Sequence, residues 1–195
     1  MKQIVAATAS AKSALVETLS LAFQDDPAFG WILPDAYDRY KRLSRLFSIM
    51  VPLDMAKGLA LHSAQNEVAT LWRAPGNAHD RPLDMITALL PLLGSFGFAI
   101  GRAMAVGRSI DAHHPKDFDY YYLHYAGVRP DHQGKGWGGA AIREGIARAS
   151  AAGKSVYLET ATQSNVGLYQ RMGFVVRDEW DVPRGGPHFW SMLRQ

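Results

Sequence analysis

Residues 120–139 read YYYLHYAGVRPDHQGKGWGG and carry three structural signals in succession. The first nine residues, Tyr120–Val128, are rich in aromatic and aliphatic side chains and predict a strand. Arg129-Pro130 ends that strand, because proline lacks the N–H that a central strand needs. Four glycines between Gly134 and Gly139 then lead into residues 136–152, where small and apolar side chains repeat at helical spacing. The segment therefore predicts a strand, a glycine-rich turn and a helix.

A glycine-rich turn before a helix is suited to bind a phosphate group. Without Cβ atoms, main-chain N–H groups can approach an anion closely. The N–H groups of the first helical turn and the helix dipole both favour a negative charge there. A pyrophosphate would fit such a turn. The alternative is a tight turn whose glycines serve packing alone, and the glycines by themselves leave both readings open.

Two common phosphate motifs fit the sequence poorly. Gly153–Ser155 looks like the end of a P-loop, but Arg148 stands where the motif needs glycine and a strand follows. The dinucleotide pattern G-x-G-x-x-G matches within Gly134–Gly139, and Glu159 follows about 20 residues later. However, Arg129–Gln133 separate this pattern from its strand, and too few strand–helix units follow for a dinucleotide domain.

Residues 126–138 resemble the acyl-CoA signature of the GNAT superfamily of N-acetyltransferases. In that signature, a strand ending in valine is followed by x-Pro-(Asp/Glu)-x-Gln-Gly-x-Gly-x-Gly and a helix, and its core falls here on Gln133, Gly136 and Gly138. The resemblance implies that the turn holds the diphosphate of acetyl-CoA and that the main chain around Val128 pairs with the pantetheine arm. The cofactor-binding residues that it implies are Ala126, Val128, Gln133, Gly134, Lys135, Gly136, Trp137, Gly138, Gly139, Asn165 and Tyr169.

The resemblance continues beyond the turn. Residues 156–160 are similar to the family's next strand, and 165–174 are similar to its Asn…Tyr…Gly-Phe region. It implies that Asn165 binds the pantetheine arm and that Tyr169 protonates the departing CoA thiolate. For Tyr169, the alternative is an ordinary core aromatic. The C-terminal residues 183–190 and the early segment 23–31 resemble the puromycin N-acetyltransferase-like branch of the family.

The fold implied is mixed α/β. We expect a central, mostly antiparallel sheet flanked by helices, with one parallel strand pair splayed at the cofactor site. A single domain is expected over residues 1–195, with acceptor-side helices in 1–115 and the acetyl-CoA-binding core and C-terminal hairpin in 116–195. Other predicted strands are 4–7, 59–64, 67–73, 155–159, 174–180 and 188–193; predicted helices are 10–23, 37–56, a broken apolar region 83–110, and 165–172.

The predicted reaction moves an acetyl group from acetyl-CoA to the primary amine of a small molecule. The amine attacks directly without a covalent enzyme intermediate, which agrees with the absence of cysteine. Tyr169 is the expected acid, and the proton acceptor is left open between Glu159, His124 and Tyr122. The acceptor pocket is expected to include Phe29, Trp31, Tyr122 and His124, with Phe96 and Phe98 as further walls.

Composition and charge limit the partners, metals and cellular location that the sequence predicts. The 195 residues carry a net charge of +3 without a dense basic stripe, so we expect no nucleic-acid partner. The histidines show no ligand spacing, so no metal is expected. The uncharged run between Asp84 and Arg102 is short for a membrane span and is broken by proline and glycine, which favours a buried helix in a cytoplasmic protein. A homodimer, a non-catalytic acyl-CoA-binding module and a dinucleotide-binding protein remain alternatives, and the amine and the acyl-chain preference are open.

Overall fold

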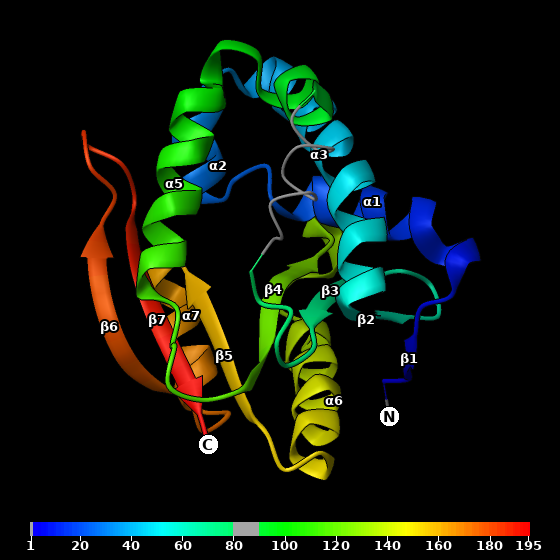
Figure 1. The fold of residues 1–195 in the computed structure, drawn as a ribbon. Coiled ribbons are helices and arrows are strands. Elements are labelled where there is room, and N and C mark those ends of the chain that lie inside the picture. The colour runs from blue at the N-terminus through cyan, green and yellow to red at the C-terminus, as the bar shows by residue number, and fades with distance from the viewer. Residues whose placement is uncertain (1, 80–89) are drawn as a thin grey trace.

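The computed structural model describes residues 2–79 and 90–195, which form one seven-stranded sheet in the order β1-β2-β3-β4-β5-β7-β6 (Figure 1). The β4–β5 pair is parallel, and the other described neighbours pair in antiparallel fashion. The predicted mixed sheet is therefore confirmed. The strands are β1 Ile4–Ala6, β2 Gly58–Ser63, β3 Val68–Arg73, β4 Tyr120–Val128, β5 Ser155–Thr160, β6 Val175–Asp181 and β7 His188–Arg194.

The parallel pair separates halfway along its length, as predicted. Pairing of β4 with β5 begins at Tyr120 with Ser155 and ends at Leu123 with Leu158. Beyond that point β4 continues to pair with β3 alone, while β5 pairs with β7 up to Thr160. The C-terminal halves of two central strands thus leave main-chain groups facing a gap in the middle of the sheet.

Helices cover both faces of the sheet. Their bounds are α1 Lys12–Ala22, α2 Pro27–Ile32, α3 Ala36–Lys57, α5 Ile100–His113, α6 Trp137–Ala151 and α7 Gln163–Gln170, with short 3₁₀ helices at Ala9–Ala11, Gly97–Ala99 and Pro130–His132.

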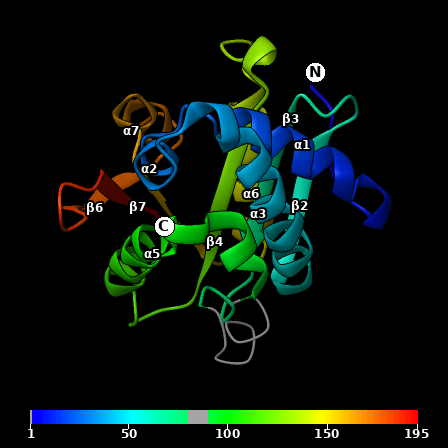
Figure 2. The ribbon, with the colours of Figure 1, turned by 90° about the horizontal axis from the view of Figure 1, so that it is seen from above.

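Two separate apolar clusters assign these helices to the two faces. Leu71 packs in the cluster that contains residues of α1, α2, α3 and α5. The next residue, Trp72, packs in the cluster that contains residues of α6 and α7. This alternation is what a strand buried on both faces requires. Seen from above, α2 and α5 lie to one side of β4 and α1 and α3 to the other (Figure 2).

Two elements differ from the predicted ones, and each difference has a physical reason. Residues 27–32 were not predicted as a helix, yet Asp26 accepts hydrogen bonds from the N–H groups of Ala28 (3.0 Å) and Phe29 (3.1 Å) and caps α2. The helix predicted from residue 10 begins as an α-helix only at Lys12, because a 3₁₀ turn precedes it. The helix predicted over residues 37–56 is observed as α3, which contains Pro52 and continues to Lys57.

The apolar region predicted as a broken helix begins outside the described residues, at 83–89. From residue 90 onwards it is broken as predicted, by the 3₁₀ helix Gly97–Ala99. It is not buried all round, since Phe96 and Val106 are buried whereas Met104 on α5 is exposed. Leu90–His113 has a mean hydropathy of 1.4, and by length and composition alone it could cross a membrane. A helix that packs one apolar face on a protein core passes the same test, so this is weak evidence for a span.

Candidate active site

A cavity of about 350 Å³ lies where β4 and β5 separate, bordered by α2, α5 and α7. It brings together residues from distant parts of the chain. Eight of the residues singled out in the sequence line it: Phe29, Phe96, Tyr122, His124, Ala126, Glu159, Asn165 and Tyr169. The aromatic side chains of Phe23, Tyr125 and Phe189 add to its walls.

The glycine-rich turn lies between the end of β4 and the start of α6. Gly134 (φ +72°) and Gly136 (φ +78°) are in the left-handed region, which favours glycine because other residues place Cβ too close to the main chain. Gly136 is the N-cap of α6, so the N–H groups of the first turn have no acceptor within the helix. The Lys135 ammonium donates to the Asp131 carbonyl at 2.8 Å and fixes the loop from outside.

The shape of this turn fits a diphosphate. A Cβ at Gly134 would meet nothing within 4 Å, and Gln133 to Gly136 are exposed, so the turn is open to a ligand. A second cation lies nearby, because the Lys2 ammonium is 4.4 Å from the centre of the Trp137 ring. Main-chain donors, a helix N-terminus and two lysines are together the donor set that a diphosphate needs.

Tyr169 lies on α7 with Asn165 one turn before it, and both line the cavity. The Tyr169 side chain is 7% exposed and meets Phe174 edge-on at 5.8 Å between ring centres. Burial, together with the negative charge of Asp26, raises the pKa of Tyr169 to about 12. The phenol therefore keeps its proton throughout the neutral pH range.

Glu159 lies near the end of β5, with a side chain only 4% exposed. Its Oε1 atom is 3.0 Å from Nε2 of His114, but the angles do not make a hydrogen bond, and Oε1 has no hydrogen-bond partner among the described residues. Three phenols surround this carboxyl group. Burial and then the charge of Glu159 raise the pKa of Tyr120, Tyr122 and Tyr157.

A second buried carboxylate, Asp54, contacts the imidazole ring of His124. Asp54 Oδ2 is 2.7 Å from His124 Nδ1, and Oδ1 accepts a hydrogen bond from Arg73 Nε at 2.7 Å. Burial alone would raise the pKa of Asp54, but the charges of His124 and Arg73 outweigh it and lower that pKa. Asp54 was not among the site residues predicted from the sequence. The available signal was its position on α3, where it continues the stripe of Leu43, Phe47 and Met50 at a place that calls for an apolar side chain.

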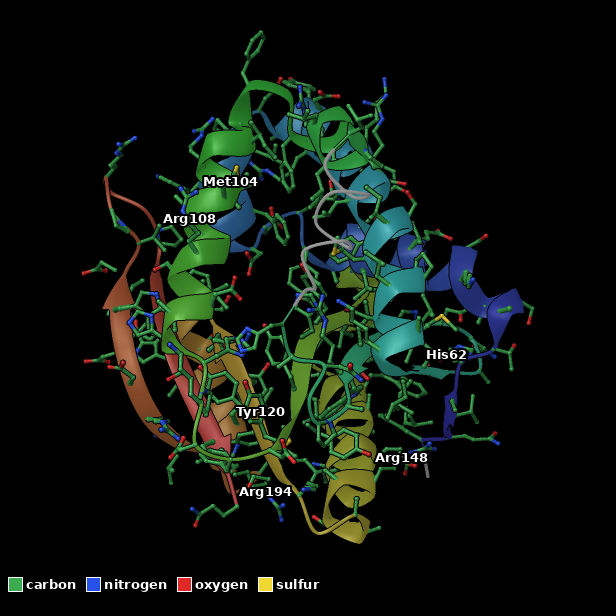
Figure 3. All side chains as sticks on the ribbon, in the orientation of Figure 1. His62, Met104, Arg108, Tyr120, Arg148 and Arg194 are labelled. Atoms are coloured by element: carbon green, nitrogen blue, oxygen red, sulfur yellow. The ribbon has the colours of Figure 1, made fainter. Side chains whose placement is uncertain are left out.

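Two aromatic residues expected at the acceptor pocket do not line this cavity. Trp31 borders a second cavity together with Arg102, Arg108 and Arg184, and the Arg102 guanidinium lies 5.9 Å from its ring centre. Figure 3 shows Arg108 there, on α5. Phe98 is fully exposed. Across residues 2–79 and 90–195, no group of three or more potential metal ligands lies together.

Comparisons with known proteins agree with this architecture. The profile of the Acetyltransferase (GNAT) family matches residues 87–174, which include β4, the glycine-rich turn, α6, β5 and α7. An uncharacterized N-acetyltransferase of Schizosaccharomyces pombe is 26% identical over 183 residues, covering 85% of this chain and 74% of the relative.

Solved structures are similar over nearly the whole chain. The structure of histone acetyltransferase HPA2 and related acetyltransferase from Corynebacterium glutamicum is 26% identical, with a TM-score of 0.74 and coverage of 100% of this chain and 96% of the other. A GNAT family acetyltransferase from Brucella melitensis, solved with acetyl-CoA, is 18% identical, with a TM-score of 0.52 and coverage of 98% and 86%.

Residues 87–174 therefore match the GNAT acetyltransferase family, and the relatives support a place for the chain in the GNAT superfamily. The same comparisons support an enzyme of the GNAT N-acetyltransferase type.

Proposed function

We propose that this enzyme acetylates the primary amine of a small molecule. The observation that carries the proposal is the cavity of about 350 Å³ at the gap between β4 and β5. Its volume lies within the roughly 300–1,000 Å³ typical of small-molecule sites. Helices α2 and α5 border it, which favours a compact acceptor over an extended peptide.

The lining of the cavity supports an amine with an apolar or aromatic body. Phe29, Phe96 and Phe189 supply apolar walls, while Asp26 and Glu159 supply two carboxyl groups. A carboxylate in a cavity of low polarity attracts a protonated amine more strongly than one in water does. Asp26 also caps α2, so of the two carboxyl groups Glu159 is the one that we assign to the substrate.

The mechanism that we propose is direct attack. The thioester of acetyl-CoA supplies an electrophilic carbonyl carbon; a C–N bond to the amine forms there, the C–S bond breaks, and the thiolate departs. Tyr169 gives its phenolic proton to the departing sulfur. Glu159 takes the proton that the amine nitrogen loses, directly or through water. The main chain at Ala126 and Val128 and the side chain of Asn165 hold the pantetheine arm, and residues 133–139 hold the diphosphate.

A panel of amines tests the substrate class. Release of free CoA from acetyl-CoA is followed with aromatic amines, aminonucleosides, polyamines, amino acids and peptides that carry a free N-terminus. Small amines with an apolar body should give the highest kcat/KM. Selective turnover of the peptides, or binding of acetyl-CoA without turnover of any small amine, would contradict the proposal.

The proton acceptor is tested by three single variants, Glu159→Gln, His124→Gln and Tyr122→Phe. With a responding amine, loss of the true acceptor should remove the acidic limb of the pH profile of kcat/KM. We expect this for Glu159→Gln alone. If the acidic limb persists in that variant and disappears in His124→Gln, the role belongs to His124.

A further inference from the structure

His114 is a buried histidine that the acetyltransferase signature does not include. It follows α5 directly, and its side chain is only 1% exposed. Both of its ring nitrogens have close neighbours. Nε2 is 3.0 Å from Oε1 of Glu159, and Nδ1 is 2.8 Å from the hydroxyl of Tyr120. Figure 3 places Tyr120 at the start of β4.

A continuous chain of donors through these three groups requires one tautomer of His114. The protonated phenol of Tyr120 can donate to Nδ1 or accept from it, and only donation to Nδ1 continues the chain towards Glu159. A neutral imidazole that accepts at Nδ1 carries its own proton on Nε2. That proton then faces Glu159, which gives a chain of donors from Tyr120 through His114 to the carboxylate.

The carboxylate needs such a donor. Oε1 of Glu159 is buried and has no hydrogen-bond partner among residues 2–79 and 90–195, and an unsatisfied buried carboxylate oxygen is costly. Other titratable groups beside the His114 ring include the phenols of Tyr122 and Tyr157, 4.7 and 5.1 Å away between ring centres, and the imidazole of His79 at 5.0 Å. Asp111 lies 3.6 Å from His79 and lines the same cavity. The nitrogen Nε2 of His114 lies 3.0 Å from Oε1, within ion-pair distance.

We propose that His114 is a positioning residue, which donates from Nε2 to Oε1 of Glu159 and so fixes this carboxylate for proton transfer at the cavity. This inference rests on the proposed function, because it assigns His114 a role through Glu159. His114 itself gains and loses no proton during the reaction. Tyr120 in turn fixes the ring of His114.

The kinetic test compares His114→Phe, which keeps a ring but removes the donor, with His114→Gln, whose side-chain amide can replace the Nε2–H. With a responding amine, His114→Phe should lower kcat at least about tenfold with an unchanged KM for acetyl-CoA, and His114→Gln should recover most of it. In a Glu159→Gln background, His114→Phe should have no further effect, since both variants remove one interaction. The matched control is His113→Gln, because His113 stacks on Trp180 and does not line the cavity.

Additive losses in the double variant, or full turnover in His114→Phe when Glu159→Gln is impaired, would overturn the inference and leave the proposed function intact. A second measurement does not need turnover. Long-range ¹H–¹⁵N NMR spectra of the imidazole of His114 should show the Nε2–H tautomer, and Tyr120→Phe should weaken that preference. A resting Nδ1–H tautomer would exclude the donor chain, even if no amine in the panel reacts.

Discussion

Gly136 holds a main-chain conformation that other residues adopt at a cost of roughly 1–2 kcal/mol. Gly136→Ala should therefore distort the turn before α6, and we expect a loss of acetyl-CoA affinity of at least about tenfold, measured by calorimetry. The matched control is Gly153→Ala at the other end of α6. Gly153 has a similar φ of +64° and open space around it, so this variant should lose similar stability without losing affinity. If both variants bind acetyl-CoA with the same affinity, the turn before α6 is not part of the coenzyme site.

Tyr169 is the residue that we propose as the acid for the departing thiolate. Removal of the hydroxyl in Tyr169→Phe keeps the packing on Phe174 and should lower kcat about 100-fold with little change in the Kd of acetyl-CoA. Because its pKa is raised to about 12, ionisation of this phenol should not reduce wild-type turnover below about pH 11. Tyr121→Phe is the control, because Tyr121 lies on β4 and does not line the cavity. Unchanged turnover in Tyr169→Phe would remove the acid assignment.

Asp54 joins three elements, since it lies on α3 and contacts Arg73 of β3 and His124 of β4. Its folded pKa is below the ordinary 3.8, so its contribution to stability is fully present above that pH and is lost as pH falls through the lowered folded value. Asp54→Asn should cost about 3–5 kcal/mol at neutral pH in urea unfolding, and the difference from wild type should shrink below pH 4.

The control for Asp54 is Asp38→Asn, which breaks a half-exposed ion pair with Arg42 within α3. We expect a change of no more than about 0.5 kcal/mol, because water screens such pairs. A cost for Asp54→Asn that is the same at pH 3 and pH 7 would show that its carboxylate charge does not stabilise the folded state.

At the scale of elements, the sequence predicted those helices and strands that are determined by residues close together in the chain. The strand and helix around the glycine-rich turn follow from local periodicity and from proline and glycine, and they lie as predicted. Helix α2 was not predicted, although its start has a local signal, the N-cap Asp26 followed by proline. His114 and Asp54 could not be assigned, because their partners come from other elements; Asp54 and His124 are 70 positions apart.

In the whole molecule, the proposed coenzyme turn and the proposed acceptor cavity both lie next to the C-terminal half of β4. The glycine-rich turn follows the end of β4, while the cavity lies under α2 and α5, and Ala126 and Tyr169 border the cavity. If acetyl-CoA binds as proposed, it contacts elements from both halves of the sheet and should stabilise the folded chain as a unit. Since it binds the folded state alone, a concentration of 100 Kd adds about 2.7 kcal/mol.

This linkage predicts a rise in Tm of about 5–11 °C with acetyl-CoA at 100 Kd, from roughly 2–4 °C per kcal/mol for a chain of this size. In Gly136→Ala, a tenfold weaker affinity at the same concentration leaves about 1.4 kcal/mol, so the shift should fall to about half. NAD at that concentration should leave the Tm unchanged. An equal shift with NAD would favour a dinucleotide site, and an undiminished shift in Gly136→Ala would place the coenzyme away from this turn.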